Sequence, residues 1–295
     1  DQVAVGGVFW TQQLRGHRGS LTEAVVQVAG RWPDAVSKPS VVRQLPEHIT
    51  VPELPATPEL ADEPWRIPVG IAEADLEPAY LELYEAEHAL IAGPARSGKS
   101  TTLLAIAESL HTAANPPAVW AICGRRSPLA NAPSSVLQRI ATEEDDLPAF
   151  TAAARMQTGP LVVLIDDAEK LEDGGQTLTN LMDANLPNLH LIAAGRADDL
   201  RNLYSHWTKR VRKARCGILL QPNADYDGDL LGVTIPRTAP VAITPGRGYT
   251  CNSGVARLVH AAEPSAVDLA ATNGVQPSRA RLWISVPPVP VPTES

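Results

Sequence analysis

The chain has 295 residues, 44% of them hydrophobic, which is enough apolar material for the core of one domain with flanking segments. Its formal net charge of −8 argues against a nucleic-acid-binding protein, because affinity for phosphate backbones comes mainly from clustered Lys and Arg. The sequence also lacks the roughly 18 consecutive apolar residues of a membrane helix, and its three cysteines form no CxxC pair, which argues against structural zinc and fits a reducing cytosol.

The first 45 residues are expected to form a connector with one helix. The chain begins at Asp1 rather than Met, without a charged-then-apolar leader, so we expect a piece of a longer protein or a processed form. Apolar residues recur at helical spacing over 21–32, with Pro33 directly after them, which predicts a short amphipathic helix. Prolines then interrupt 39–68, and we expect this stretch to run over the surface of the folded body.

Beyond this stretch, short β-rich runs alternate with helical patterns, which is typical of a mainly parallel sheet with helices on both faces. The predicted strands are 88–92, 118–123, 161–165, 189–194 and 217–221. The predicted helices are 99–112, 134–156, 175–184 and 197–214. Five strands and four crossovers predict one doubly wound α/β domain.

A phosphate-binding loop lies between the first of these strands and the first helix. The motif G-x-x-x-x-G-K-[ST] is formed by Gly93, Pro94, Ala95, Arg96, Ser97, Gly98, Lys99 and Ser100, followed by Thr101. Glycines let backbone N–H groups approach phosphate oxygens, and the helix N-terminus adds partial positive charge. We expect ATP to bind here, with Lys99 on the β- and γ-phosphates and Ser100 on Mg²⁺. The alternative is a plain glycine-rich turn beside a surface lysine.

The strand 161–165 ends in two carboxylates, Asp166 and Asp167. A fully apolar run followed by acids is expected where a central strand emerges beside the P-loop, so Asp166 is a candidate for the Mg²⁺ shell. The next position often carries a glutamate base, and Asp167 is one methylene shorter, which would displace the attacking water. Glu169 is a second candidate base. The alternative is a core strand followed by an acidic helix cap.

One further strand, 118–123, is predicted between Lys99 and Asp166, which places the chain among additional-strand P-loop NTPases of the RecA-like type, rather than kinases or GTPases. Such ATPases usually have a polar γ-phosphate sensor at the end of the next strand, where this chain has Ala194. Arg196 follows and is a candidate to reach a phosphate, although an arginine at such a turn is more often solvated or capping.

The later motifs, taken by themselves, indicate structural roles. The stretch 207–215 ends a predicted helix with five cations, which favours a solvated face that complements the helix dipole. Asp225, Asp227 and Asp229 do not have the spacing of an EF-hand, so we expect a turn. The tail 263–295 ends in VPPVPVPTES and is predicted to be proline-rich or disordered.

Several stretches together resemble the FtsK/SpoIIIE family, and within it the EccC ATPase domains of type VII (ESX) secretion systems. They include VVRQLPEHITVPELP, EHALIAGPARSGKSTTL, the double-aspartate Walker B form, GRADDLRNLYSHWTKRVRKARCGILLQPNADYDGDLLGV and PGRGYTCNSGVARLVHA. The resemblance covers about residues 21–262, with 46–262 as the ATPase domain. The last two stretches are the more discriminating ones, since generic ATPases lack them.

The resemblance implies a role in the export of small helical substrates. It implies several ATPase domains in one chain, so 1–45 can include the end of a preceding domain, and a position on the cytosolic side of a complex anchored in the inner membrane. Substrates would bind through their export signal. Because ring ATPases complete a neighbour's site in trans, Arg212, Arg215 and Arg247 are candidate arginine fingers.

Three functions follow as hypotheses. The first is an ATP-binding domain of this secretion complex that hydrolyses ATP slowly or not at all alone, as Asp167 and Ala194 suggest. The second is a DNA-translocating motor, which the negative charge and the lack of a basic tail disfavour. The third is a module that binds export-signal peptides and has a degenerate nucleotide site, against which Lys99, Ser100 and Asp166 argue.

Overall fold

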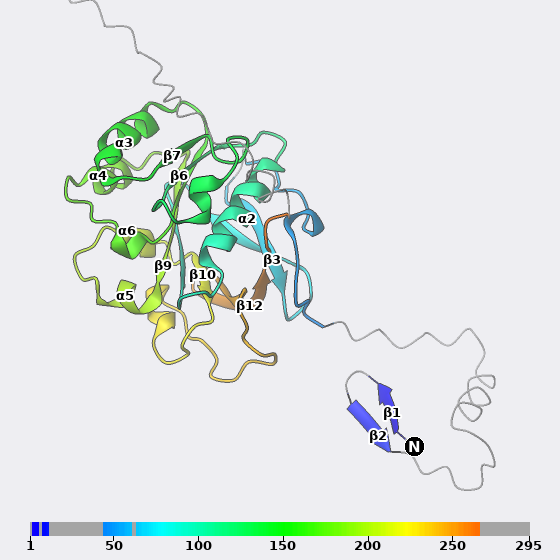
Figure 1. Cartoon of the computed structure of the whole chain (residues 1–295). Coiled ribbons are helices and arrows are strands. Elements are labelled where there is room, and N and C mark those ends of the chain that lie inside the picture. The colour runs from blue at the N-terminus through cyan, green and yellow to red at the C-terminus, as the bar shows by residue number, and fades with distance from the viewer. Residues whose placement is uncertain (1, 6–7, 12–43, 61–62, 266–295) are drawn as a thin grey trace, which may run out of the picture.

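The computed structural model describes residues 2–5, 8–11, 44–60 and 63–265. The predicted helix over 21–32 and nearly all of the predicted tail 263–295 lie outside the described residues. Near the start, β1 (Gln2–Val5) and β2 (Val8–Thr11) form an antiparallel hairpin that the sequence patterns did not indicate. The remaining described strands form one ten-stranded sheet (Figure 1).

Six neighbouring strands of this sheet are parallel, and they include all five that the sequence predicts. In spatial order they are β10 (Gly217–Leu220), β5 (Ala89–Gly93), β9 (Leu189–Arg196), β8 (Leu161–Ile165), β6 (Ala118–Ile122) and β7 (Arg139–Ala141). Every residue of β5, β8 and β10 is buried, as expected for strands covered on both faces. The mainly parallel α/β fold is confirmed. The strand predicted over 118–123, β6, follows β5 in the chain but lies beyond β8 in the sheet, and β9 is the strand that lies between the P-loop strand β5 and β8.

Four antiparallel strands extend the sheet beyond β10. They are β11 (Arg247–Asn252), β12 (Val255–Ala261), β3 (Trp65–Ala72) and β4 (Pro78–Leu83). The edge of β4 is covered by Asn252, whose side chain donates to Tyr80 O at 2.8 Å and accepts from Glu82 N at 3.2 Å. The extension therefore curls back on itself and protects an otherwise exposed strand edge.

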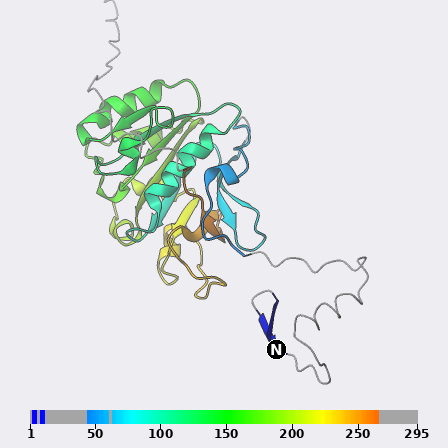
Figure 2. The same cartoon turned by 45° about the vertical axis from the view of Figure 1, so that its right-hand side comes forward.

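Helices cover both faces of the parallel strands (Figures 1 and 2). On one face α2 (Lys99–His111) packs with Val162 and Leu164 of β8. The opposite face carries α3 (Leu147–Met156), α4 (Thr177–Asp183), α5 (Ala197–Asn202) and α6 (Thr208–Arg212). The short 3₁₀ turns are η1 (Val51–Glu53), η2 (Pro128–Asn131), η3 (Glu144–Asp146), η4 (Ala168–Lys170) and η5 (Asp227–Leu230).

Two predicted helices are wrong in extent. The helix expected over 134–156 begins only at Leu147, and β7 and η3 precede it. Pro148 occupies the first turn, where its missing N–H costs nothing, whereas a helix that ran through it would lose a hydrogen bond. The helix expected over 197–214 is broken into α5 and α6, because His206 Nε2 and Trp207 Nε1 bind Leu171 O at 2.9 and 2.7 Å and hold the intervening turn.

Two histidines lie in the core at the start of β5 and β9. His88 is 7% exposed and His190 is 1% exposed. His88 Nδ1 accepts a hydrogen bond from Leu191 N, and the His190 ring lies 4.3 Å from the Trp65 ring. Burial, with a smaller contribution from His190, lowers the pKa of His88 from 6.5 to about 4. Both rings are therefore neutral at pH 7.

This burial predicts acid sensitivity. Between pH 6.5 and about 4 the unfolded chain binds a proton that the folded His88 does not, so the His88 contribution to stability is present above pH 6.5 and is lost as the pH falls. We expect about 2 kcal/mol of this contribution to be lost between pH 7 and 5. Urea unfolding at pH 7, 6 and 5 measures it. The fall in unfolding free energy between pH 7 and 5 should be smaller in His88→Gln and unchanged in His48→Gln, whose imidazole is exposed. An equal fall in both variants would contradict the assignment.

None of the helices in the described part of the chain has the length and apolar character needed to span a bilayer. The three cysteines are buried and free. Among the residues 2–5, 8–11, 44–60 and 63–265, no group of three or more His, Cys, Asp or Glu side chains is arranged to hold a metal ion.

Candidate functional site

The predicted phosphate-binding loop connects the end of β5 to the start of α2. Arg96 and Gly98 have φ values of 62° and 102°, which turn the backbone sharply between strand and helix, and Gly98 adopts its value without the penalty of a side chain. Gly93 lies so close to β10 that a Cβ there would be 2.5 Å from Leu220 O. The loop therefore has the tight backbone that a phosphate cradle requires.

Lys99 is folded back over this loop. Its residue is 8% exposed, and Nζ donates to Pro94 O at 2.6 Å and to Gly93 O at 3.2 Å. Burial lowers the pKa of Lys99, and the negative charges of Glu169 and Asp166 oppose this shift. Among the described residues, no carboxylate lies within ion-pair distance of Lys99. The loop thus holds a buried ammonium whose present partners are neutral carbonyls, and an anion would be a stronger partner.

Asp166 lies beside Ser100 at the carboxyl edge of the sheet. Ser100 Oγ donates to Asp166 Oδ2 at 2.9 Å, and Ser127 Oγ donates to the same oxygen at 2.6 Å. Hydroxyl and carboxylate oxygens are the ligands that Mg²⁺ prefers, so this donor set fits that ion. Sequence reasoning did not single out Ser127. The signal was available, because Ser127 follows β6, which neighbours β8, and parallel strands end at the same edge.

The two candidate bases have different surroundings. Asp167 has φ 52°, and its Oδ2 accepts from Lys170 Nζ at 2.7 Å, with the carboxyl group 47% exposed. The Glu169 side chain is only 3% exposed, and its Oε2 accepts from Arg196 N at 3.2 Å. Glu169 Oε1 is buried without a hydrogen-bond partner among the described residues, and burial raises the pKa of this carboxyl. Of the two candidate bases, Glu169 is therefore the one that shares the interior of the site with Lys99.

Arg196 is placed next to the phosphate-binding loop by the sheet register. It pairs with Gly93 across β9 and β5, while Ala194 pairs with Ile91 deeper in the core. The Arg196 guanidinium is half exposed, and its Nε lies 4.0 Å from Glu169 Oε1. A side chain with this exposure is free to turn toward a ligand on the loop.

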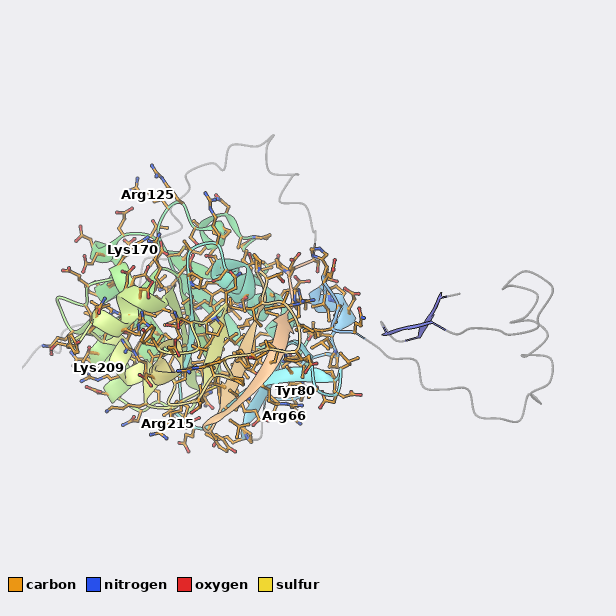
Figure 3. All side chains as sticks on the ribbon, turned by 90° about the horizontal axis from the view of Figure 1, so that it is seen from below. Arg66, Tyr80, Arg125, Lys170, Lys209 and Arg215 are labelled. Carbon is orange, nitrogen blue, oxygen red and sulfur yellow. The ribbon has the colours of Figure 1, made fainter. Side chains whose placement is uncertain are left out.

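The side chains of the other three arginines do not join this cluster. Arg212 donates to Leu200 O, and burial lowers its pKa. Arg215 is exposed directly before β10, at the amino end of a strand parallel to β5, so it lies at the opposite edge of the sheet from the loop. Figure 3 accordingly shows Arg215 well separated from Lys170. Arg247 is buried and donates to backbone carbonyls. The fold thus gathers Lys99, Ser100, Asp166, Glu169 and Arg196, joined by Ser127.

Comparison with known proteins shows a likeness to components of type VII secretion systems. No protein-family model matches the chain. The ESX-1 secretion system protein EccCb1 of Mycobacterium tuberculosis is 35% identical over 113 residues, which are 37% of this chain and 17% of that protein. The ESX secretion system protein EccC of Thermomonospora curvata is 29% identical over 263 residues, 78% of this chain and 19% of that protein.

Solved structures show a likeness to the same proteins. A structure of Thermomonospora curvata EccC, comprising ATPases 2 and 3 in complex with a signal sequence peptide, is 25% identical with a TM-score of 0.58 and covers 86% of this chain and 51% of that chain. The match to each of the two curated relatives covers less than a fifth of that relative's length, so this chain corresponds to one part of such proteins.

Proposed function

Since the chain resembles EccC proteins of type VII secretion systems in sequence and fold, we propose that it binds ATP and Mg²⁺ as one ATPase domain of such a secretion complex. The observation that carries the proposal is the buried Lys99 ammonium on the glycine loop, beside the Ser100–Asp166 pair of oxygen ligands. Lys99 and the loop amides would hold the phosphates, and Ser100 and Asp166 would hold Mg²⁺.

Hydrolysis by the isolated chain is expected to be slow. Asp167 is half exposed and paired with Lys170, so it is poorly placed to activate a water. Glu169 is better placed, but its carboxylate is almost fully buried, accepts a hydrogen bond from Arg196 N and has a raised pKa. A neighbouring domain would then complete the site, and the exposed Arg215 is the candidate finger best able to reach another subunit.

The partners follow from the same likeness. The Thermomonospora curvata EccC structure contains a signal sequence peptide, which supports binding of secreted helical proteins through an export signal here as well. Further partners would be other ATPase domains of the same chain or ring and the membrane secretion complex, with this domain on the cytosolic side. Nucleic acid is disfavoured by the net charge of −8.

The test is a titration of the purified chain with a fluorescent ATP analogue and Mg²⁺, with phosphate release measured on the same sample. We expect saturable binding together with turnover far below about 10 s⁻¹, an ordinary enzyme rate. Turnover near that rate would contradict slow hydrolysis. Absence of binding would favour a peptide-binding module with a degenerate site, and DNA-stimulated, salt-sensitive hydrolysis would favour a DNA motor.

A further inference from the structure

Residues 45–57, here named the strap, lie along α2 on the outside of the domain (Figure 2). Ile49, Val51 and Leu54 of the strap are buried and pack against Ala105 of α2. Val51 N donates to Glu263 O at 3.0 Å and Glu263 N donates to Ile49 O at 2.8 Å, so the strap is also paired with the chain that leaves β12. The strap is thus an integral layer over the helix that begins at the phosphate-binding loop.

Both ends of the strap are fixed by buried polar contacts. At the far end, Thr57 Oγ1 donates to Ser109 O at 2.6 Å and Thr57 N donates to Thr112 Oγ1 at 2.8 Å, both at the end of α2. At the near end, Arg247 Nη2 donates to Leu45 O at 3.4 Å and to Pro46 O at 3.3 Å. The strap therefore spans α2 from its last turn back to the strand β11 that begins with Arg247.

The buried guanidinium of Arg247 relies on these carbonyls as hydrogen-bond acceptors. Arg247 is 8% exposed, and its Nη1 donates to Ala242 O at 3.0 Å. Within the described part of the chain no carboxylate forms an ion pair with it. A buried charge without a counter-ion is costly unless its donors are satisfied by hydrogen bonds. Lifting the strap would remove the Leu45 and Pro46 acceptors, so the position of Arg247 and the docking of the strap stabilise each other.

The residue before Arg247 contacts the phosphate-binding loop directly. Gly246 N donates to Ser97 O at 3.0 Å, and Gly246 O accepts from Ala261 N at 2.8 Å. Gly246 has φ 80°, and a Cβ at this position would lie 3.3 Å from the His260 ring, so the backbone here is closely packed. Arg247 is thus linked through one peptide unit and one hydrogen bond to Ser97, two residues before Lys99.

We propose that Arg247 is a positioning residue that couples the strap to the phosphate-binding loop, so that nucleotide affinity depends on whether the chain entering the domain is docked. The inference rests on the proposed nucleotide binding and gives Arg247 a role within its own domain, different from that of a finger in trans. Coupling is reciprocal, so a nucleotide must also tighten the strap. The upstream polypeptide thereby gains a mechanical connection to the site.

The experiment compares the full chain with Arg247→Ala, Arg247→Gln and Arg257→Ala. Arg257 is the matched control, an exposed arginine on the neighbouring strand β12 that pairs with Asp75. We expect the Kd for the fluorescent ATP analogue to rise about tenfold in Arg247→Ala and to stay unchanged in Arg257→Ala. Arg247→Gln removes the buried charge and keeps an amide donor, so it is expected to fold even if the alanine variant does not and to weaken binding as well.

Amide hydrogen exchange distinguishes coupling between the strap and the nucleotide from a general loss of domain stability. In the wild type, the analogue should slow exchange over 49–57, and in the Arg247 variants this effect of the nucleotide should be lost. Unchanged Kd values in folded Arg247 variants, or a strap whose exchange ignores the nucleotide in the wild type, would overturn the inference. A wild-type chain that binds no analogue at all would overturn the proposed function and this inference with it, which is a distinguishable result.

Discussion

Lys99→Ala is expected to abolish measurable binding of an ATP analogue. The substitution removes the only ammonium held on the phosphate-binding loop in the described structure, which donates to Pro94 O and Gly93 O and has no carboxylate partner. Hydrogen bonds from a charged donor are worth about 1.5–3 kcal/mol each, so we expect at least a roughly 100-fold higher Kd in the analogue titration.

The control for this variant is Lys209→Ala, which removes an exposed lysine of α6 that Figure 3 shows apart from Lys170. Binding should be unchanged there. The melting temperature of Lys99→Ala should equal or exceed that of the wild type, because burial penalises the Lys99 charge. If Lys99→Ala binds the analogue as tightly as the wild type while remaining folded, the phosphates are bound elsewhere and the proposed function fails.

The second large effect is expected for Glu169→Gln. Any hydrolysis by this chain should depend on the buried Glu169 carboxylate, since a general base contributes about 10²–10⁴-fold and Asp167 is directed toward Lys170. We expect phosphate release to fall about 100-fold while the Kd for the analogue is preserved. Because burial raises the pKa of Glu169, wild-type release should increase as the pH rises and the carboxylate form accumulates.

Two further variants test whether Glu169 rather than Asp167 is the general base. Asp167→Asn should change phosphate release by less than about fivefold, since it removes only an exposed pair with Lys170. Gly195→Ala would place a Cβ 2.7 Å from Glu169 Oε2 and displace the carboxylate, so it should slow release without loss of binding. A large effect of Asp167→Asn together with a small effect of Glu169→Gln would reverse the two roles.

Some of the missed fold was available in the sequence. The hairpin of β11 and β12 turns at Ser253 and Gly254, with φ values of 49° and 85°, and a two-residue turn that ends in glycine between β-rich runs is a recognised hairpin signal. The strands β3 and β4 were harder to predict, because Pro68 and Pro78 lie within them and because β3 pairs on its other side with β12, which is remote in sequence. Pro78 is tolerated because it begins the edge strand β4. Pro68 lies at a register irregularity between β3 and β4, before the part of β3 that pairs with β12.

The sequence by itself determined the parallel core and the phosphate-binding loop, because both depend on local properties. Continuous apolar runs of about five residues bounded by turns are typical of strands buried on two faces, and the glycines and lysine of the motif lie in one strand–helix turn. The tertiary structure alone decided the rest of the site. The left-handed bend at Asp167 turns that carboxylate outward and brings Glu169 beside Lys99, and strand order places Ser127 on Asp166. Contacts between residues distant in sequence depend on how strands pair, and residue spacing does not encode that pairing.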